Sequence, residues 1–304
     1  MKIGAFTAAS NITGICLDVP AITALLHRYG ALAFWDYATA APYLKMDMNA
    51  SSWDGGAMLG SQGAARSEGE EIGPTGSPQG PRPSLPPNAR PNYKIDALYL
   101  SGHKLVGGPG TPGVLVVKKF LVQNDVPERP GGGTVFFVKD HSHRYLSNQV
   151  EREEGGTPDI LGSIRLGLCF GLKERVGATY ATERGALFAK KTLESFCSNR
   201  NIVVLGDFQS PRLPIFSFLI RHGPSFLHYN FVCALLNDLF GIQVITTTRF
   251  PLFLASSHPS SLPHERRECL PFPRLILGVN FGTFISIQGI VLRLKLSPSF
   301  PSAP

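Results

Sequence analysis

The stretch "YLSGHKLVGGPGTPGVLVVKK", residues 99–119, is the most informative part of this chain for its fold. An apolar run leads into serine, glycine, histidine and lysine, passes through glycines and prolines, and returns into a second apolar run. The two runs are close enough in the sequence to pair as an antiparallel hairpin. Ser101, His103 and Lys104 would then stand at the end of a strand, where α/β proteins place their ligands.

The segment "GPGTPG", residues 108–113, also matches the glycine spacing of a dinucleotide-binding loop. Such a loop must open a helix, whereas this one leads into the β-branched run "VLVV". We therefore reject a dinucleotide site here.

The amino-terminal residues predict strand, helix and strand in succession. Residues 2–6 read as a strand, "LDVPAITALLHRYG" as a helix capped by Asp18 with Pro20 in its first turn, and "ALAFWD" as a buried strand that ends on Asp36. This order is typical of a parallel α/β sheet with helices on its faces.

Two donors and an amine at one strand end, with an acid at the end of another, match the needs of pyridoxal phosphate. Ser101 and His103 can grip a phosphate, Lys104 can form a Schiff base with an aldehyde, and Asp36 can pair with a pyridine nitrogen. Taken singly, a lysine or an aspartate at a strand end is more often a solvated surface residue or a cap.

The composition limits the class of protein. The chain has 304 residues, 43% of them hydrophobic, which is enough for a large core or two small ones. The net charge is +7, but the basic residues are scattered, mostly beside acidic ones, and form no basic stripe, so nucleic-acid binding is not indicated. The 5 cysteines are far apart, and no secretory signal is evident at the amino terminus, which predicts an intracellular protein, cytoplasmic or else mitochondrial.

The organisation along the chain changes several times. We expect parts of a large domain at residues 1–50 and 93–196, a disordered Gly/Pro/Ser-rich insertion at 51–92, part of a smaller α/β domain at 197–244, and a divergent, poorly ordered tail at 245–304. The uncharged residues 275–292 are barely long enough to span a membrane. Their glycines, Asn280 and Gln288 argue against a span.

Four motifs, "SNITG", "FWDYATAAPY", "SGHKLVGGPGTPGVLVVKK" and "EREEGGTPDILGSIRLGL", carry a family resemblance in this order and spacing. From Lys2 to about Val244, apart from the insertion, the chain resembles the class V aminotransferase family, in its cysteine desulfurase-like branch. The resemblance implies an α/β large domain of the pyridoxal-phosphate transferase type I kind with a mainly parallel sheet, and a smaller α/β carboxy-terminal domain. It also implies pyridoxal 5'-phosphate as cofactor and a small amino acid as substrate.

The resemblance implies a role for each matching residue. Lys104 would be the catalytic Schiff-base lysine. The cofactor-binding residues would be Asp36 at the pyridine nitrogen, Ala38 against the ring, Ser101 and His103 at the phosphate, Asn11 near the cofactor hydroxyl, and Thr157 at the phosphate of a neighbouring subunit. A homodimer follows from the role of Thr157. No metal site is expected: His141 and His143 have chelating spacing, but no cluster completes a site.

The chain departs from the family pattern at several points. Thr39 stands where many desulfurases have a glutamine, the family's phosphate loop is missing upstream, and only Arg249, out of register, could replace its carboxylate-binding arginine. We therefore expect a truncated chain. Its function would be that of a pyridoxal-phosphate enzyme that acts on an amino acid, and the alternative is an inactive remnant or interaction protein that retains the fold.

Overall fold

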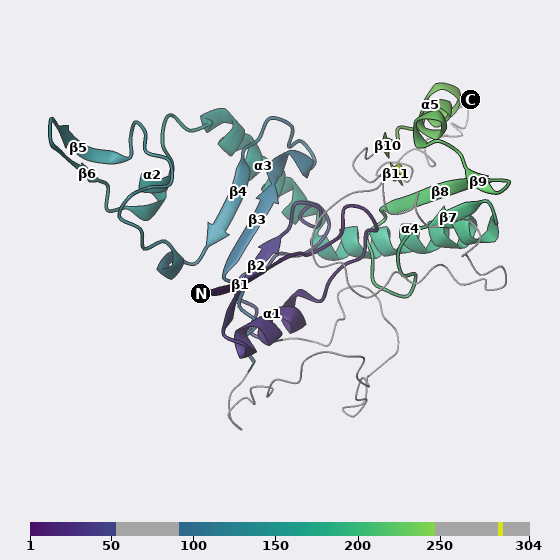
Figure 1. The fold of residues 1–304 in the computed structure, drawn as a ribbon, viewed down its shortest axis with the longest axis horizontal. Helices are drawn as coiled ribbons and strands as arrows, with labels where there is room; N and C mark the ends of the chain where they lie inside the picture. The colour runs from purple at the N-terminus through teal and green to yellow at the C-terminus, as the bar shows by residue number, and fades with distance from the viewer. Residues whose placement is uncertain (53–90, 247–284, 288–304) are drawn as a thin grey trace, which may run out of the picture. The chain divides into compact units, whose positions relative to one another are not determined.

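The computed structural model describes residues 1–52, 91–246 and 285–287 (Figure 1). The described residues divide into two compact units, one comprising 1–8, 18–52 and 91–178 and the other 9–17, 179–246 and 285–287. Most of the predicted insertion and of the predicted tail, including all but three residues of the apolar stretch 275–292, lies outside the described residues.

A four-stranded sheet forms the centre of the first unit, in the order β1-β2-β3-β4. The strands are β1 (Lys2–Thr7), β2 (Ala31–Asp36), β3 (Ala97–Ser101) and β4 (Gly113–Val117). The first three are parallel, and β4 pairs antiparallel with β3. The mainly parallel sheet and the antiparallel return are thus confirmed. The segment "GPGTPG" leads into strand β4 and not into a helix.

The helix α1 (Val19–Arg28) connects β1 to β2, as predicted, and packs against one face of the sheet. A carboxylate oxygen of Asp18 accepts a hydrogen bond from the Ala21 amide at 3.0 Å, which caps the first turn. The indole of Trp35, fully buried on β2, donates to the hydroxyl of Thr23 at 2.9 Å. This bond satisfies both buried polar groups and fixes the helix on the strand.

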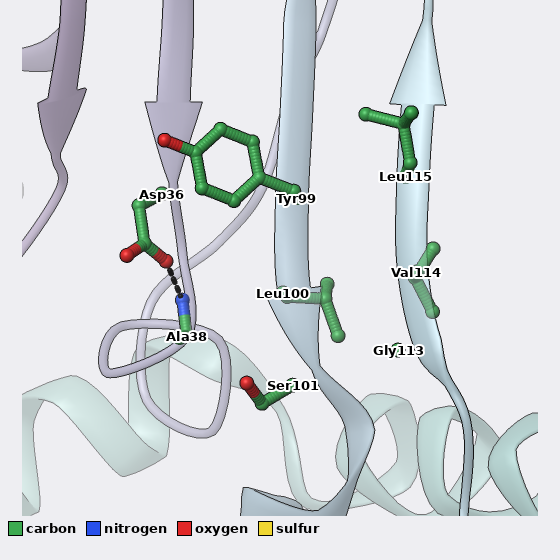
Figure 2. Close-up of a pocket in the computed structure, with 8 residues that line it drawn as sticks. All are labelled: Asp36, Ala38, Tyr99, Leu100, Ser101, Gly113, Val114 and Leu115. Atoms are coloured by element: carbon green, nitrogen blue, oxygen red, sulfur yellow. Dashed lines mark hydrogen bonds between the residues drawn. The ribbon is translucent and has the colours of Figure 1, made fainter. Parts of the chain in front are cut away.

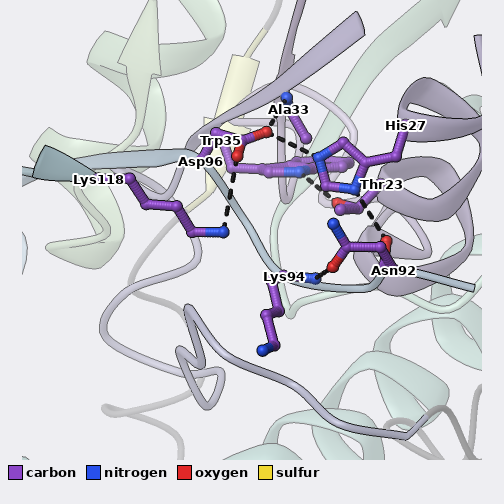
Figure 3. A network of polar contacts seen from close by, with 8 residues as sticks. All are labelled: Thr23, His27, Ala33, Trp35, Asn92, Lys94, Asp96 and Lys118. Atoms are coloured by element: carbon purple, nitrogen blue, oxygen red, sulfur yellow. Dashed lines mark hydrogen bonds and ion pairs between the residues drawn. The ribbon is translucent and has the colours of Figure 1, made fainter. Parts of the chain in front are cut away.

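A buried carboxylate, Asp96, joins four elements at the amino-terminal end of β3 (Figure 3). One oxygen lies 2.7 Å from Nε2 of His27 and accepts from the Ala33 amide at 2.8 Å, and the other lies 3.6 Å from Nζ of Lys118. Nδ1 of His27 is also 2.9 Å from the carbonyl of Asn92. Because so many partners satisfy it, the buried charge holds α1, β2, β3 and the end of β4 together.

The rest of the first unit follows the sheet along the chain. It contains the single-turn 3₁₀ helices Gly102–Lys104 and Lys119–Leu121, the hairpin strands β5 (Val135–Lys139) and β6 (Ser142–Tyr145), and the helices α2 (Gln149–Glu153) and α3 (Ile160–Val176). Figure 1 shows the β5–β6 hairpin as a projecting arm. Asp159 caps α3 by accepting from the Gly162 amide at 2.9 Å.

The second unit has an antiparallel sheet with helices, in keeping with the predicted smaller α/β unit. Its elements are α4 (Ala178–Ser198), β7 (Ile202–Val204), β8 (Phe216–His222), β9 (Ser225–Phe226), α5 (Tyr229–Phe240), β10 (Ile245–Thr246) and β11 (Ile285–Ile287). The sheet order is β10-β11-β8-β7, with β9 beside β8. The buried cluster is formed by Ala189, Val204, Phe216, Phe218 and Val232. Within the described ranges, no helix has the length and apolarity needed to cross a membrane.

Candidate functional site

A pocket of about 400 Å³ lies where β2 and β3 end and β4 begins (Figure 2). Its lining consists of Asp36, Ala38, Tyr99, Leu100, Ser101, Gly113, Val114 and Leu115. The volume is in the range of small-molecule sites, and the carboxyl ends of parallel strands are where open α/β sheets bind ligands. Three of the residues predicted from sequence to bind a cofactor, Asp36, Ala38 and Ser101, therefore lie around one pocket.

Strand register brings the polar side chains of this pocket together. Asp36 pairs with Tyr99 across β2 and β3, and Ser101 lies two residues further along the same strand. Because side chains alternate along a strand, Tyr99 and Ser101 point to the same side of the sheet. Gly113 pairs with Ser101 from β4, so β4 places no side chain directly opposite the serine.

The carboxylate of Asp36 is held by the backbone that follows it. Its Oδ1 atom accepts a hydrogen bond of 2.7 Å from the amide of Ala38, and its other oxygen is turned away from that amide (Figure 2). The amide of Tyr37, the residue between Asp36 and Ala38, donates to the carbonyl of Tyr99 at 2.8 Å and continues the parallel pairing beyond the strand. Thr39, at the predicted departure from the family glutamine, is 8% exposed. The carboxylate is thus fixed before any ligand arrives.

Tyr99 belongs to the pocket, although the sequence analysis did not select it. Burial raises the pKa of its phenol, and the negative charge of Asp36 raises it further. The sequence did not mark Tyr99 as a pocket residue because "ALYLS" has the pattern of an ordinary apolar strand. Its spacing of two from Ser101 was the available signal.

His103 and Lys104 come shortly after Ser101, the last residue of β3 that lines the pocket. They lie in the 3₁₀ turn Gly102–Lys104, which begins one residue after Ser101, and both side chains are exposed and outside the pocket lining. The backbone then folds back so tightly that a Cβ atom on Gly108 would collide with the carbonyl oxygen of Gly102. Only glycine fits at position 108, and this close packing holds the backbone on both sides of Lys104 in place.

Two further predicted residues do not line the pocket. Asn11 is exposed in a turn of the second unit, where the hydroxyl of Ser10 accepts from the amides of Ile12 and Thr13. Thr157 is exposed in the loop between α2 and α3 of the first unit. The amide just before it, that of Gly156, donates to the carbonyl of Gly132 at 2.8 Å. The structure therefore groups three of the predicted side chains and leaves four outside that group.

The two histidines with chelating spacing lie on the β5–β6 hairpin. His143 packs edge-on against Tyr145, with ring centroids 5.1 Å apart, and His141 is in the connecting turn. In the part of the chain that the structure describes, no group of three or more histidine, cysteine, aspartate or glutamate residues is arranged to hold a metal ion.

Known proteins resemble this chain in sequence and in fold. A probable cysteine desulfurase from Halalkalibacterium halodurans is 26% identical over 216 residues, which are 71% of this chain and 42% of that protein. The structure of a cysteine desulfurase from Thermococcus onnurineus matches with a TM-score of 0.57 and 22% identity, covering 81% of this chain and 50% of that one. The chain thus spans about half the length of these relatives, or less.

A second solved structure is a variant of the cystine C-S lyase C-DES, with glycine covalently linked to its pyridoxal-phosphate cofactor. It matches with a TM-score of 0.54 and 16% identity and covers 81% of this chain and 53% of that one. At this identity the match shows the fold alone.

The family model described as Aminotransferase class-V matches residues 1–61 and 87–246. The unmatched residues between the two segments fall within the insertion expected at 51–92. Since the matched segments make up most of its length, the chain belongs to the class-V aminotransferase family.

Proposed function

We propose that this chain forms part of a pyridoxal-phosphate-dependent enzyme of the cysteine desulfurase-like kind, acting on a small amino acid. The observation that carries the proposal is the convergence of Asp36 and Ser101, from two parallel strands, on one pocket, with Lys104 three residues after Ser101 in the chain. The class-V family is pyridoxal-phosphate-dependent, and its relatives include named cysteine desulfurases.

The polar groups around the pocket fit this cofactor. The fixed carboxylate of Asp36 can hold a proton on a ring nitrogen, and the hydroxyl of Ser101 can donate to a phosphate oxygen. Ala38, also in the lining, has a small side chain that leaves room for a planar ring beside Asp36. When bound, the cofactor supplies an aldehyde and an electron-withdrawing ring.

The remaining predicted residues complete the proposed site. Lys104 would hold the cofactor covalently through Nζ, and this amine, once displaced by the substrate amine, would move a proton at the substrate α-carbon; His103 would assist Ser101 at the phosphate. Asn11 would serve the cofactor hydroxyl, and Thr157 would reach the phosphate of a neighbouring subunit in a homodimer. Residues 1–50 and 93–196 would form the large-domain part and 197–244 the small-domain part.

Borohydride trapping tests the proposal. The purified chain is incubated with pyridoxal phosphate, its visible absorbance is recorded, and the mixture is reduced with borohydride for peptide mass analysis. We expect a visible band and a reduced adduct on Lys104, both lost in Lys104→Ala. Lys119→Ala, which removes an exposed lysine beyond β4, is the matched control and should keep both signals.

The test depends on modification of Lys104 alone among the lysines of the chain. An adduct spread over several lysines, or a band that persists in Lys104→Ala, would contradict the proposal. Such a result would favour the alternative, an inactive protein that retains the family fold.

A further inference from the structure

The helix α3 contacts the loop that follows Lys104 and the turn that follows Asp36. Nη1 of Arg165 donates to the carbonyl of Pro109 at 2.8 Å, in the loop that follows Lys104. Nζ of Lys173 donates to the carbonyl of Leu44 at 2.7 Å, at the end of the turn that follows Asp36. One helix is therefore bonded through charged donors, which make the stronger kind of hydrogen bond, to the segments that follow Lys104 and Asp36.

The turn 37–44 carries Ala38 and ends on a carbonyl that Lys173 satisfies. Within it, the Ala41 amide donates to the carbonyl of Tyr37 at 2.7 Å and the Leu44 amide donates to that of Ala40 at 2.8 Å. The last carbonyls of such a helical turn have no partner inside it. A lysine ammonium can take that place, and at Leu44 it does.

Lys173 is an unusual residue for its position. Its side chain is half-buried, and burial lowers the pKa of its amine. Burial of an ammonium group is unfavourable unless a hydrogen bond compensates for it. The bond to the carbonyl of Leu44 provides that compensation, and an apolar residue here could pack but could not hold the turn.

The loop 105–112 is held in the same way by Arg165. The Gly108 amide donates to the carbonyl of Leu105 at 2.9 Å, and the Thr111 amide donates to that of Gly108 at 3.0 Å. Gly110 has a φ of +79°, and a Cβ atom there would lie 2.9 Å from Nη1 of Arg165. The loop therefore leaves space for the guanidinium to reach the carbonyl of Pro109.

We propose that Arg165 and Lys173 are positioning residues that bind the loop 105–112 and the turn 37–44 to one helix, and so fix Asp36 relative to Lys104. The bonds are properties of the cofactor-free protein. Their value to the pocket rests on the function proposed above, because fixed spacing matters only if both residues hold one ligand.

Two variants and a matched control test this role. Lys173→Met and Arg165→Met remove the charged donors and keep side chains of similar length. Arg175→Met removes an exposed charge two residues after Lys173 on the same helix. Lys173→Arg is the conservative variant expected to restore the bond to Leu44.

The first measurement is hydrogen exchange in the absence of pyridoxal phosphate. In Lys173→Met we expect the Ala41 and Leu44 amides to exchange about tenfold faster. In Arg165→Met the same increase should appear at the Gly108 and Thr111 amides. Arg175→Met should leave both segments unchanged. Unchanged exchange in both donor variants, or an increase spread evenly over the whole unit, would overturn the proposal.

The second measurement is the dissociation constant of pyridoxal phosphate by absorbance titration. Both donor variants should bind about tenfold more weakly, with Lys173→Arg close to the parent chain. Equal affinity in all variants, despite faster local exchange, would overturn the positioning role. If the parent chain binds no cofactor while the local exchange responds as expected, the proposed function fails and the attachment of both segments to α3 stands.

Discussion

Asp36 and Tyr99 lie in register across the parallel pairing of β2 with β3, and both line the same pocket. The carboxylate is fixed by the Ala38 amide, and its charge adds to the effect of burial in raising the pKa of the phenol. The tyrosine therefore stays neutral beside a carboxylate. A neutral phenol can donate a hydrogen bond toward a ligand, which a phenolate cannot.

This relationship predicts the effect of Asp36→Asn on Tyr99. Removal of the negative charge makes the phenolate less unfavourable, so the pKa of Tyr99 should fall. Burial, the larger cause, is unchanged, so the pKa should stay above its ordinary value. An NMR titration of carbon-labelled tyrosine measures the shift, with Tyr99→Phe to identify the signal. A pKa of Tyr99 that rises or does not change in Asp36→Asn would contradict the pairing.

The tyrosine next to Asp36 predicts a loss of stability in alkali. Tyr37 is 4% exposed, and burial, aided by the charge of Asp47, raises the pKa of its phenol. The unfolded chain releases this proton near pH 10, at the ordinary tyrosine pKa, while the folded protein keeps it. The free energy of unfolding should therefore fall as the pH rises above about 10.

Urea unfolding at pH 7 and pH 11 measures this loss. Tyr37→Phe, which has no proton to release, should lose less stability between the two pH values than the parent chain. The pH 7 values serve as the reference, because the phenol is protonated in both states there. An equal loss in both proteins would show that Tyr37 does not contribute.

The tight return after Lys104 predicts a cost for Gly108→Ala. The added Cβ would collide with the carbonyl oxygen of Gly102, and two backbone segments would have to move apart. We expect a loss of about 1–3 kcal/mol in the free energy of unfolding. Gly132→Ala is the control, since a Cβ atom at Gly132 would meet nothing within 4 Å. Equal stability of the two variants would contradict the close packing at Gly108.

The buried carboxylate at the start of β3 predicts a large effect of Asp96→Ala. The substitution leaves His27, Lys118 and the Ala33 amide without their shared acceptor. The free energy of unfolding should fall by about 3–5 kcal/mol. The control is Asp47→Ala, because Asp47 pairs with Lys45 at 3.9 Å on the surface, and such a pair contributes less than about 1 kcal/mol. Thermal or urea unfolding followed by circular dichroism compares the two.

Much of the fold could be predicted from local sequence signals. The apolar run "ALAFWD", the cap at Asp18 and the β-branched run of β4 predicted strand, helix and strand near their observed bounds. These signals work because capping and backbone preference act over a few residues. Asp36, Ser101 and Lys104 could be selected for the same reason, since each stands at the end of a recognisable strand.

The rest of the site depends on residues far apart in the chain. Tyr99 joins the pocket through register with β2, and Arg165 and Lys173 reach carbonyls 56 and 129 residues away. No local pattern marks such contacts, because a helical lysine with a structural partner looks the same in sequence as one in solvent.

Local backbone preferences and side-chain chemistry are enough to predict most strands and helices, and the acid, hydroxyl and amine that suit one cofactor. Folding of the whole chain is needed to bring Asp36 and Tyr99 to one pocket and to bond α3 to the segments that follow Asp36 and Lys104. Strand register and helix packing are fixed by the burial of whole surfaces, and that burial exists only once the chain has folded.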